Sequence, residues 1–372
     1  MKLFLTVALL LSQLIPSLAQ DPDYANNPIP VPEQPKTKVI KLNANIPVHH
    51  FVMPVKDIQM IAICGDSVNL GYLPYKKNYF KKTIALPDKP LQDYLQEYVN
   101  KQYGDQYKSD NGKDLLCLIQ SFRIAEGAVD KAYVRIKAVA FLSADNQQFQ
   151  LSCQIDTTLV YDNKRDSRAH SENITQAIDL LMKAADRQNI TAAFHSKDEI
   201  LNIAWRGYKQ PIYTTSQFND GIYTSYKDFL KNAPSVTNFT LGVEYGKVVA
   251  YHIHDDSTCN IINQPWGMCY QGQLYRYNVD WFIPMKRQGL SFMFTDPEFK
   301  SDQDTKITGA QMANYAGQTA EAVAGFLLFG MVQVPGFHVP GGNLINTLPY
   351  LNNLPDPPIA TMIDPFTGEL MF

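Results

Sequence analysis

The chain has 372 residues and a formal net charge of -3 at pH 7; 45% of its residues are hydrophobic and 19% are charged. This is the composition of an ordinary globular protein, and the length is enough for about two domains. The sequence contains neither a basic field nor an acidic tail, which excludes nucleic acid as an expected partner.

The N-terminus has the parts of a secretory signal peptide. Met1-Lys2 is followed by an apolar run over residues 3–14 and by the small-residue segment Pro16-Ser17-Leu18-Ala19. We therefore predict a signal peptide over residues 1–19, a mature chain that begins at Gln20, and an exported protein that is periplasmic or extracellular. The alternative is a retained N-terminal anchor, for which the apolar run is short.

Residues 20–48 are predicted to form a proline-rich linker. Prolines recur there among polar residues, and apolar periodicity is almost absent before Val39. Such a composition favours an extended chain over a packed element.

Residues 49–207 are predicted to form an α/β domain. Apolar residues alternate in some of its segments and recur at helical spacing in others. In chain order we expect a strand over 58–64, a helix over 90–103, strands over 115–122, 132–142 and 151–159, and a helix from near Ser171. This order describes helices on one face of a mostly antiparallel sheet, so the predicted fold class is α+β.

A capping box marks the end of the first domain. Ser196 can accept a hydrogen bond from the backbone of Glu199, whose side chain can reach back to Ser196. We predict a helix over 197–206 and a join over 208–218. The mature chain should split at the join into two protease-resistant pieces.

Residues 219–300 are predicted to form a β-rich domain. It begins with a short helix over 225–232. Segments rich in aromatic and β-branched residues then predict strands over 237–242, 247–254, 273–277 and 279–283. An antiparallel meander with one buried face is the simplest arrangement.

Residues 301–372 combine an Ala/Gly-rich helix with a Pro-rich tail. Alanines four apart predict a close-packed helix over 310–329. The apolar run at its end is brief, so a buried or interfacial helix is favoured over a membrane span, and contact of residues 313–334 with a membrane is left open. Prolines from Pro335 onward predict an irregular tail.

Two blocks in the second half resemble a module that recurs in uncharacterised exported proteins of Bacteroidota. They are Asp220-Gly221-Ile222-Tyr223 with Asp228-Phe229, and Trp266-Gly267-Met268-Cys269 with Gly289-Leu290-Ser291-Phe292. The closing segment Ile363-Asp364-Pro365-Phe366-Thr367-Gly368-Glu369 is similar to the tail of such proteins. The likeness covers about residues 220–370 and implies no known activity.

Residues 57–190 resemble more loosely the small α/β domain of envelope lipoproteins that accompany transport systems. The likeness rests on a first strand that ends at Gly65-Asp66-Ser67 with Gly71, on the helix at Leu91, and on three strands before a late helix at Ile174. The chain departs from that family because it lacks the lipid-bearing Cys.

Gly65-Asp66-Ser67, directly after an apolar strand, is similar to the nucleophile block of the esterase family named for that tripeptide. The resemblance implies Ser67 as a nucleophile that a His, oriented by an Asp, would activate. The sequence has no Gly-x-Asn-Asp and no Asp-x-x-His segment to supply the other groups. A turn is therefore the favoured role of Ser67, and a catalytic role is the alternative.

His252 and His254 are candidate metal ligands, with Asp256 as a third. Residues two apart in a strand share one face, and imidazole and carboxylate groups bind zinc. The third ligand would have to come from a turn. Two histidines on the solvated side of a strand are the simpler interpretation, and no cofactor is predicted.

The five cysteines are too few for a disulfide-built scaffold, and their odd number leaves at least one thiol unpaired. Cys117 and Cys153 lie in apolar strand patterns and are predicted to be small buried hydrophobic residues. Cys259 and Cys269 bracket a turn-rich segment, which makes them candidates for a disulfide in an oxidising compartment.

A cluster of lysines and aromatic residues is a candidate contact for an anionic lipid or polysaccharide surface. Its lysines can neutralise negative charge and its rings can stack. A solvated loop is the default interpretation. The cluster consists of Lys76, Lys77, Lys81 and Lys82 around Tyr75, Tyr79 and Phe80.

The leading hypothesis is a non-enzymatic, two-domain binding or assembly protein of the bacterial cell envelope, with an envelope protein as partner. The signal-like N-terminus, the proline-rich linker and the aromatic-rich strands favour it. The competing hypothesis is a serine hydrolase of the Gly-Asp-Ser type that uses Ser67. A metal-dependent role at His252 and His254 is a further alternative.

Overall fold

A computed structural model describes most of the chain from Lys36 onward. The described residues are 36–42, 46–75, 78–108, 111–127, 131–162, 167–187, 193–244, 247–278, 281–294 and 358–372. Lys36–Phe372 form one compact unit. The predicted signal peptide, most of the predicted linker and the Ala/Gly-rich helix lie outside the described residues.

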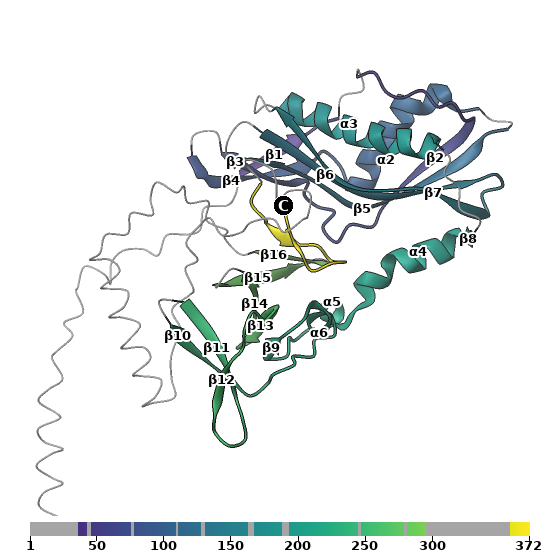
Figure 1. The fold of residues 1–372 in the computed structure, drawn as a ribbon. Helices are drawn as coiled ribbons and strands as arrows, with labels where there is room; N and C mark the ends of the chain where they lie inside the picture. The colour runs from purple at the N-terminus through teal and green to yellow at the C-terminus, as the bar shows by residue number, and fades with distance from the viewer. Residues whose placement is uncertain are drawn as a thin grey trace, which may run out of the picture. The chain divides into compact units, whose positions relative to one another are not determined.

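The first half of the chain builds an eight-stranded sheet (Figure 1). Its order is β1-β4-β3-β5-β6-β7-β8, and β2 pairs with β5. The pairs β1–β4, β2–β5 and β3–β5 are parallel, and the others are antiparallel. The strands are β1 (Lys36–Ile40), β2 (Val55–Ala62), β3 (Gly71–Tyr75), β4 (Asn78–Pro87), β5 (Lys113–Glu126), β6 (Lys131–Ser143), β7 (Gln148–Asp162) and β8 (Phe194–Ser196).

The long strands β5, β6 and β7 form where the sequence alternates apolar residues. Ile136, Ala138 and Ala140 share one face of β6 and are fully buried, as the alternation predicts. The strands are longer than expected because each neighbour supplies backbone partners well beyond the apolar centre. β6 pairs with β7 from Lys131 to Ser143, with one bulge.

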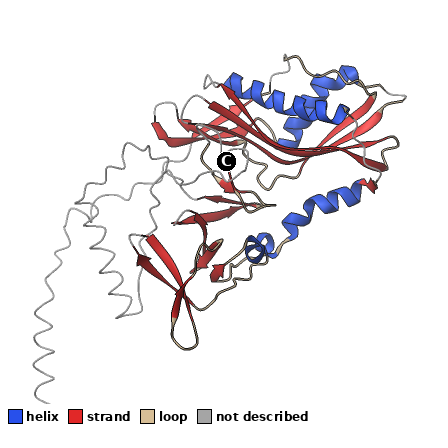
Figure 2. Ribbon diagram, viewed as in Figure 1, coloured by secondary structure: helices blue, strands red, loops and turns tan. Residues whose placement is uncertain are grey.

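Two helices lie beside this sheet (Figure 2): α2 (Leu91–Tyr103) and α3 (Ser167–Asp186). The Gln96 side chain of α2 donates to the Ile58 carbonyl at 2.8 Å and accepts from the Met60 amide at 2.7 Å. It thus satisfies backbone groups of β2 with which no described strand pairs. In α3, the predicted apolar stripe is buried: Ile174, Ala177, Ile178, Leu181, Met182 and Ala185. The coarse prediction of an α+β fold is therefore confirmed.

Residues after β8 form α4 (Lys197–Trp205), η2 (Arg206–Lys209) and α5 (Pro211–Thr214). The predicted capping box is present: Ser196 accepts from the Glu199 amide at 3.2 Å, and the Glu199 carboxylate accepts from the Ser196 amide at 2.9 Å. The predicted join at 208–218 lies within the compact unit, and Tyr208 and Ile212 are buried there. The two protease-resistant pieces stay a prediction, which limited proteolysis would test.

The second half builds two sheets. The seven-stranded sheet has the order β18-β17-β16-β15-β14-β13-β9, and the three-stranded sheet has the order β10-β11-β12. α6 (Tyr226–Leu230) begins at the N-cap Ser225. The strands are β9 (Gly221–Tyr223), β10 (Phe239–Glu244), β11 (Lys247–Ile253), β12 (Cys259–Ile261), β13 (Gly267–Tyr270), β14 (Gln273–Asn278), β15 (Trp281–Gln288), β16 (Ser291–Phe294), β17 (Met362–Ile363) and β18 (Leu370–Met371).

The end of the chain is not irregular, as its prolines suggested, but forms the hairpin of β17 and β18. The Asp364 carboxylate accepts from the Phe366 amide at 2.8 Å and from the Thr367 amide at 3.1 Å, which fixes the turn. Gly368 closes it with φ +75, a conformation that few other residues adopt. Pro358 precedes β17 and Pro365 lies within the turn, so neither proline interrupts the pairing of the two strands.

The predicted linker is also too long at its C-terminal end. Residues 36–40 form β1, which pairs in parallel with β4 from Lys36↔Thr83 to Ile40↔Pro87. Ile40 is fully buried in the first core. Pairing with a distant strand, rather than local periodicity, makes this segment a strand.

The C-terminal hairpin packs against both halves of the chain. Phe372 contacts Tyr133 of β6, with their ring centroids 6.2 Å apart. On the other side, the Tyr226 hydroxyl donates to the Pro365 carbonyl at 2.9 Å. Leu370 is fully buried in the core of the seven-stranded sheet. The hairpin therefore joins the two large sheets through buried contacts.

Asp186, at the end of α3, fixes the segment that leads into β2. Its carboxylate accepts from the amides of Val52 at 2.9 Å and Met53 at 3.0 Å, and it lies 2.8 Å from His49 Nε2. Burial alone would raise the pKa of Asp186, but the two amides and His49 outweigh it and the pKa is lowered. The carboxylate is thus held in its charged form.

Asp186→Asn is expected to lower the free energy of unfolding by about 1–3 kcal/mol at neutral pH, because the amide offers one acceptor oxygen in place of two. Since the folded pKa of Asp186 is lowered, its contribution is complete above the unfolded pKa of about 3.9 and is lost as pH falls through the folded value. Urea denaturation should show a constant difference above about pH 5 that shrinks below about pH 4.

Asp255→Asn is the matched control, because Asp255 is exposed in the turn after β11. This variant should match the wild type at every pH. A difference between the wild type and Asp186→Asn that grows in acid would contradict a lowered pKa of Asp186 in the folded state.

Candidate functional site

The loop after β2, Gly65–Asn69, is held by the carboxylate of Asp66. Asp66 Oδ1 accepts from the Val68 amide at 3.0 Å, and Oδ2 accepts from Asn69 Nδ2 at 2.6 Å. Asp66 and Asn69 are buried, whereas Val68 is 68% exposed. The loop therefore turns two polar side chains inward and closes on itself.

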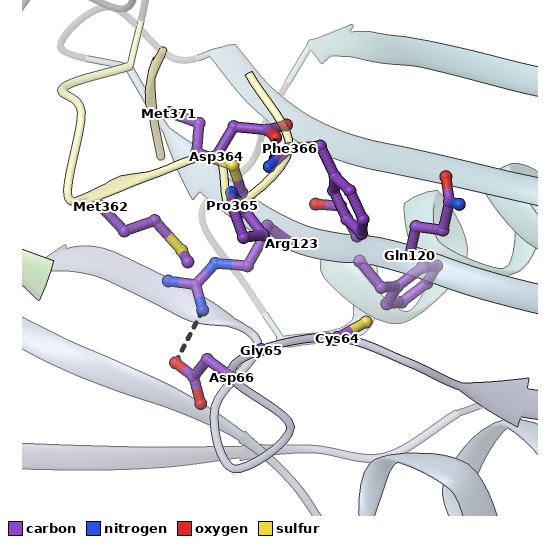
Figure 3. Close-up of a pocket in the computed structure, with 12 residues that line it drawn as sticks. Cys64, Gly65, Asp66, Gln120, Arg123, Met362, Asp364, Pro365, Phe366 and Met371 are labelled. Carbon is purple, nitrogen blue, oxygen red and sulfur yellow. Dashed lines mark hydrogen bonds and ion pairs between the residues drawn. The ribbon is translucent and has the colours of Figure 1, made fainter. Parts of the chain in front are cut away.

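Arg123 of β5 completes this cluster (Figure 3). Its Nη1 donates to Asp66 Oδ2 at 3.0 Å and to Asn69 Oδ1 at 2.9 Å, and its Nε donates to the main-chain oxygen of Phe372 at 3.4 Å. The side chains of Arg123 and Asp66 are each 2% exposed. Arg123 Nη2 is buried with no hydrogen-bond partner among the described residues. This buried ion pair connects β2, β5 and the C-terminal hairpin.

A small cavity lies between this cluster and the hairpin. Its size is about that of one water molecule. Sites for drug-sized ligands are about 300–1,000 Å³. The cavity is therefore smaller than an ordinary ligand site. Its lining includes Cys64, Arg123, Asp364, Phe366 and Met371.

Cys64, at the mouth of this loop, is a neutral thiol. Its Sγ donates to the Ile119 carbonyl at 3.3 Å. Burial, the main cause, raises its pKa to about 12, although the Arg123 charge acts in the opposite direction. Because the thiolate is the nucleophilic form, Cys64 is unreactive at neutral pH.

Ser67 is exposed, next to the buried Asp66. The Asp66 carboxylate is already engaged by Arg123 and by the loop. Two histidines of the described residues have carboxylate partners elsewhere: His49 pairs with Asp186, and His170 pairs with Glu126 at 2.6 Å. The tripeptide thus forms a turn whose conformation the ion pair fixes.

The structure brings two of the three candidate metal ligands together. His252 of β11 and His254, just after that strand, have ring centroids 4.2 Å apart. His254 Nε2 accepts from Asn260 at 2.9 Å, and Asp256 accepts from the Thr258 hydroxyl at 2.6 Å. Within the described residues, no group of three His, Cys, Asp or Glu side chains is arranged to hold a metal ion.

Cys259 and Cys269 are both free thiols, so the candidate disulfide is not present in the structure. Cys259 is exposed on β12 of the small sheet, and Cys269 is buried on β13 of the seven-stranded sheet. The Cys269 thiol donates to Asp220 Oδ1 at 3.1 Å. The segment between the two cysteines runs from the three-stranded sheet to the seven-stranded sheet. Its turn-forming residues therefore do not bring the two cysteines together in a short loop.

Two of the four lysines in the lysine cluster, Lys81 and Lys82, belong to β4. Lys76 and Lys77 lie outside the described residues. An anionic surface as partner therefore stays a prediction.

A second charged cluster lies where the hairpin meets β6. Arg135 and Asp156 form an ion pair across β6 and β7, and Lys137 lies 3.7 Å from Asp156 and 3.9 Å from Asp364. Burial acts to raise the pKa of Asp156, but Arg135 and Lys137 outweigh it and the pKa is lowered. Lys137 Nζ also lies 5.0 Å from the centre of the Phe366 ring. These contacts fix the hairpin and engage both carboxylates of this cluster with cations.

The outer edge of β7 is a candidate binding surface. β6 pairs with β7 along its length on one side, but β8 pairs only with Gln148–Gln150 on the other. In the described part of the chain, no strand pairs with the outer edge at Leu151–Ile155 or Thr157–Asp162. Such an edge exposes backbone donors and acceptors that can pair with another strand.

Sequence reasoning missed Arg123 and the β7 edge. A signal for Arg123 was available, because a single arginine interrupts the otherwise apolar strand Phe122-Arg123-Ile124-Ala125 and a buried arginine requires a partner. The edge had no local signal, since only the full set of strand pairs shows which strand lies at the side of a sheet.

No protein-family model and no curated protein matches the sequence. Among solved structures, the chain is similar to a Xanthomonas campestris protein described as DUF330, with 14% identity and a TM-score of 0.30 over 41% of this chain and 97% of that chain. It is also similar to an uncharacterized protein, with 11% identity and a TM-score of 0.27 over 40% of this chain and 98% of that one. At these TM-scores, the two likenesses assign neither a family nor a function to this chain.

Proposed function

We propose that the protein is a non-enzymatic binding or assembly component of the cell envelope that reaches its place by export. The observation that carries this proposal is the outer edge of β7, which offers backbone hydrogen-bonding groups to another extended chain. The signal-like residues 1–19 and the resemblance of residues 220–370 to exported proteins support the cellular location. An envelope protein is the proposed partner.

The contacts of the buried carboxylates support a role in binding over a role in catalysis. The cavity beside Arg123 has room for about one water molecule, and Asp66, Asp156 and Asp364 are engaged by cations or backbone amides. Among the described helices, none is long and apolar enough to cross a bilayer.

The location can be tested by fractionating cells that express the full chain. We expect the protein outside the cytosol and with an N-terminus at Gln20. Cross-linking in intact cells should then capture an envelope protein. A chain that begins at Met1 and occurs only in the cytosol would contradict the proposal.

Fluorophosphonate labelling tests the competing hydrolase. We expect no stoichiometric labelling of the wild type, because Ser67 has no activating histidine among its described contacts. Ser67→Ala should have the same unfolding midpoint as the wild type, since Ser67 is exposed. Stoichiometric labelling that Ser67→Ala abolishes would establish the hydrolase instead.

A further inference from the structure

The turn of the C-terminal hairpin has a carboxylate at each end. The Asp364 amide donates to the Glu369 carbonyl at 2.8 Å, so these two residues close the loop between β17 and β18 as neighbours on opposite strands. The Cβ atoms of residues paired in this way lie about 4.5–5.5 Å apart, and like charges at such positions are destabilising. The hairpin therefore brings two carboxylates together at the base of its turn.

The two carboxylates differ in their partners. Asp364 accepts from two amides of the turn, its Oδ2 lies 3.9 Å from Lys137 Nζ, and its side chain is 2% exposed. Glu369 is half-buried, and its side chain forms no ion pair or hydrogen bond in the described part of the chain. The fold thus compensates the charge of Asp364 by direct contacts and does not do so for Glu369.

Charged side chains of the first sheet also face Glu369. Arg135 and Lys137 of β6 act to lower its pKa, whereas Asp364 and Asp156 act to raise it. Burial is the main cause of the shift and Asp364 is the next, and together they outweigh the two cations, so the pKa of Glu369 is raised. Its neutral form is therefore favoured in the folded chain.

The other elements around the turn leave this balance unchanged between mild acid and neutral pH. On α6, the Tyr226 ring packs over Gly368, and burial raises the pKa of its phenol, which stays neutral. On β5, Arg123 is paired with Asp66 at 3.0 Å, so their charges compensate each other.

We propose that the C-terminal hairpin holds the two large sheets together more firmly in mild acid than at neutral pH, and that Glu369 is the group that titrates. Protonation removes the repulsion between Glu369 and Asp364 and leaves a neutral carboxyl group in the half-buried position. The hairpin packs on both large sheets, so its own stability sets how firmly they are joined. This inference goes beyond the proposed function, since it requires no partner.

The free energy of unfolding depends on how Glu369 titrates in the folded and unfolded states. Well below the unfolded pKa of about 4.3, the carboxyl group is protonated in both states and contributes no pH dependence. Because its folded pKa is raised, stability is lost as the pH rises through the unfolded and then the folded value. At neutral pH the full cost of the ionised group is present.

Glu369→Gln tests the proposal in the full chain, because glutamine has the size of the protonated side chain and no charge. In urea denaturation, its unfolding midpoint should exceed that of the wild type at neutral pH and should approach the wild-type value by about pH 4. Glu172→Gln is the matched control and should give no gain at either pH, since Glu172 lies in a surface pair with Arg168 at 3.1 Å. A midpoint of Glu369→Gln at neutral pH equal to or below the wild-type value, or a gain of equal size in acid, would overturn the proposal.

Asp364→Asn tests the carboxylate pair as a cause. The asparagine oxygen can still accept from the turn amides, whereas the charge that repels Glu369 is gone. In this background, Glu369→Gln should give a smaller gain in the unfolding midpoint at neutral pH than it does in the wild type. An undiminished gain would overturn the repulsion between Asp364 and Glu369.

Hydrogen exchange shows whether the effect is located in the hairpin. The amides of Thr361 and Asp364 bond across it to the carbonyls of Met371 and Glu369, both at 2.8 Å. After correction for the intrinsic exchange rate, their protection in the wild type should be greater in mild acid than at neutral pH. In Glu369→Gln this difference should be lost. Equal protection of these amides at the two pH values in the wild type would contradict the proposal.

Discussion

Phe372→Ala is expected to lower the free energy of unfolding by about 3–5 kcal/mol, the range typical of truncating a buried Phe. Phe372 is 1% exposed and packs on Tyr133, where the C-terminal hairpin meets the first sheet. Truncation leaves a cavity at this seam. Because whole domains are stable by only about 5–15 kcal/mol, the variant should be close to unfolding at 37 °C. Urea denaturation followed by circular dichroism measures the loss.

Phe194→Ala is the matched control, since it is the same substitution at a side chain that is 59% exposed. It should change the free energy of unfolding by no more than about 0.5 kcal/mol. Losses of equal size in the two variants would show that the hairpin is not packed as described.

Asp66→Asn should have a comparably large effect through a different cause. The substitution removes the carboxylate but leaves the Arg123 charge buried at 2% exposure. Breaking a buried ion pair in this way costs about 3–5 kcal/mol, because the remaining charge is unpaired in a medium that solvates it poorly. The same denaturation experiment, at a pH where both groups are charged, measures the loss.

Two further variants separate the buried charge from other causes. Asp162→Asn removes the partner of Lys131 on the surface, where the carboxylate is 92% exposed, and should leave the unfolding midpoint unchanged. Adding Arg123→Met to Asp66→Asn removes the unpaired charge and should recover much of the loss. A double variant less stable than Asp66→Asn would indicate that Arg123 stabilises the fold through its other contacts.

The helices and the central strands could be predicted because their signals are local. Ile174, Ile178 and Met182 recur at helical spacing and form the buried stripe of α3, and Ser196 with Glu199 marks the start of α4. Each signal depends on residues within a few positions of one another. Contacts with distant residues only lengthen these helices and strands.

The C-terminal hairpin, β1 and the ion pair could not be predicted in the same way, because each depends on a distant partner. Ile40 pairs with Pro87, and Met362 pairs with Met293, each across a long interval of sequence. Asp66 looked like part of a nucleophile block until Arg123 was placed beside it. The spacing of residues along the sequence does not show which distant segments pair with one another.

The long interval of sequence between β16 and β17 affects how the chain can fold during synthesis. β16 can pair with β17 only after residue 362 has been synthesised, and Tyr133 can pack against Phe372 only after residue 372 has been synthesised. Contacts between such distant positions make folding slow. We therefore expect nascent chains to stay incompletely folded until residue 372 has left the ribosome, a state in which they can still be threaded through a narrow channel and in which they depend on chaperones.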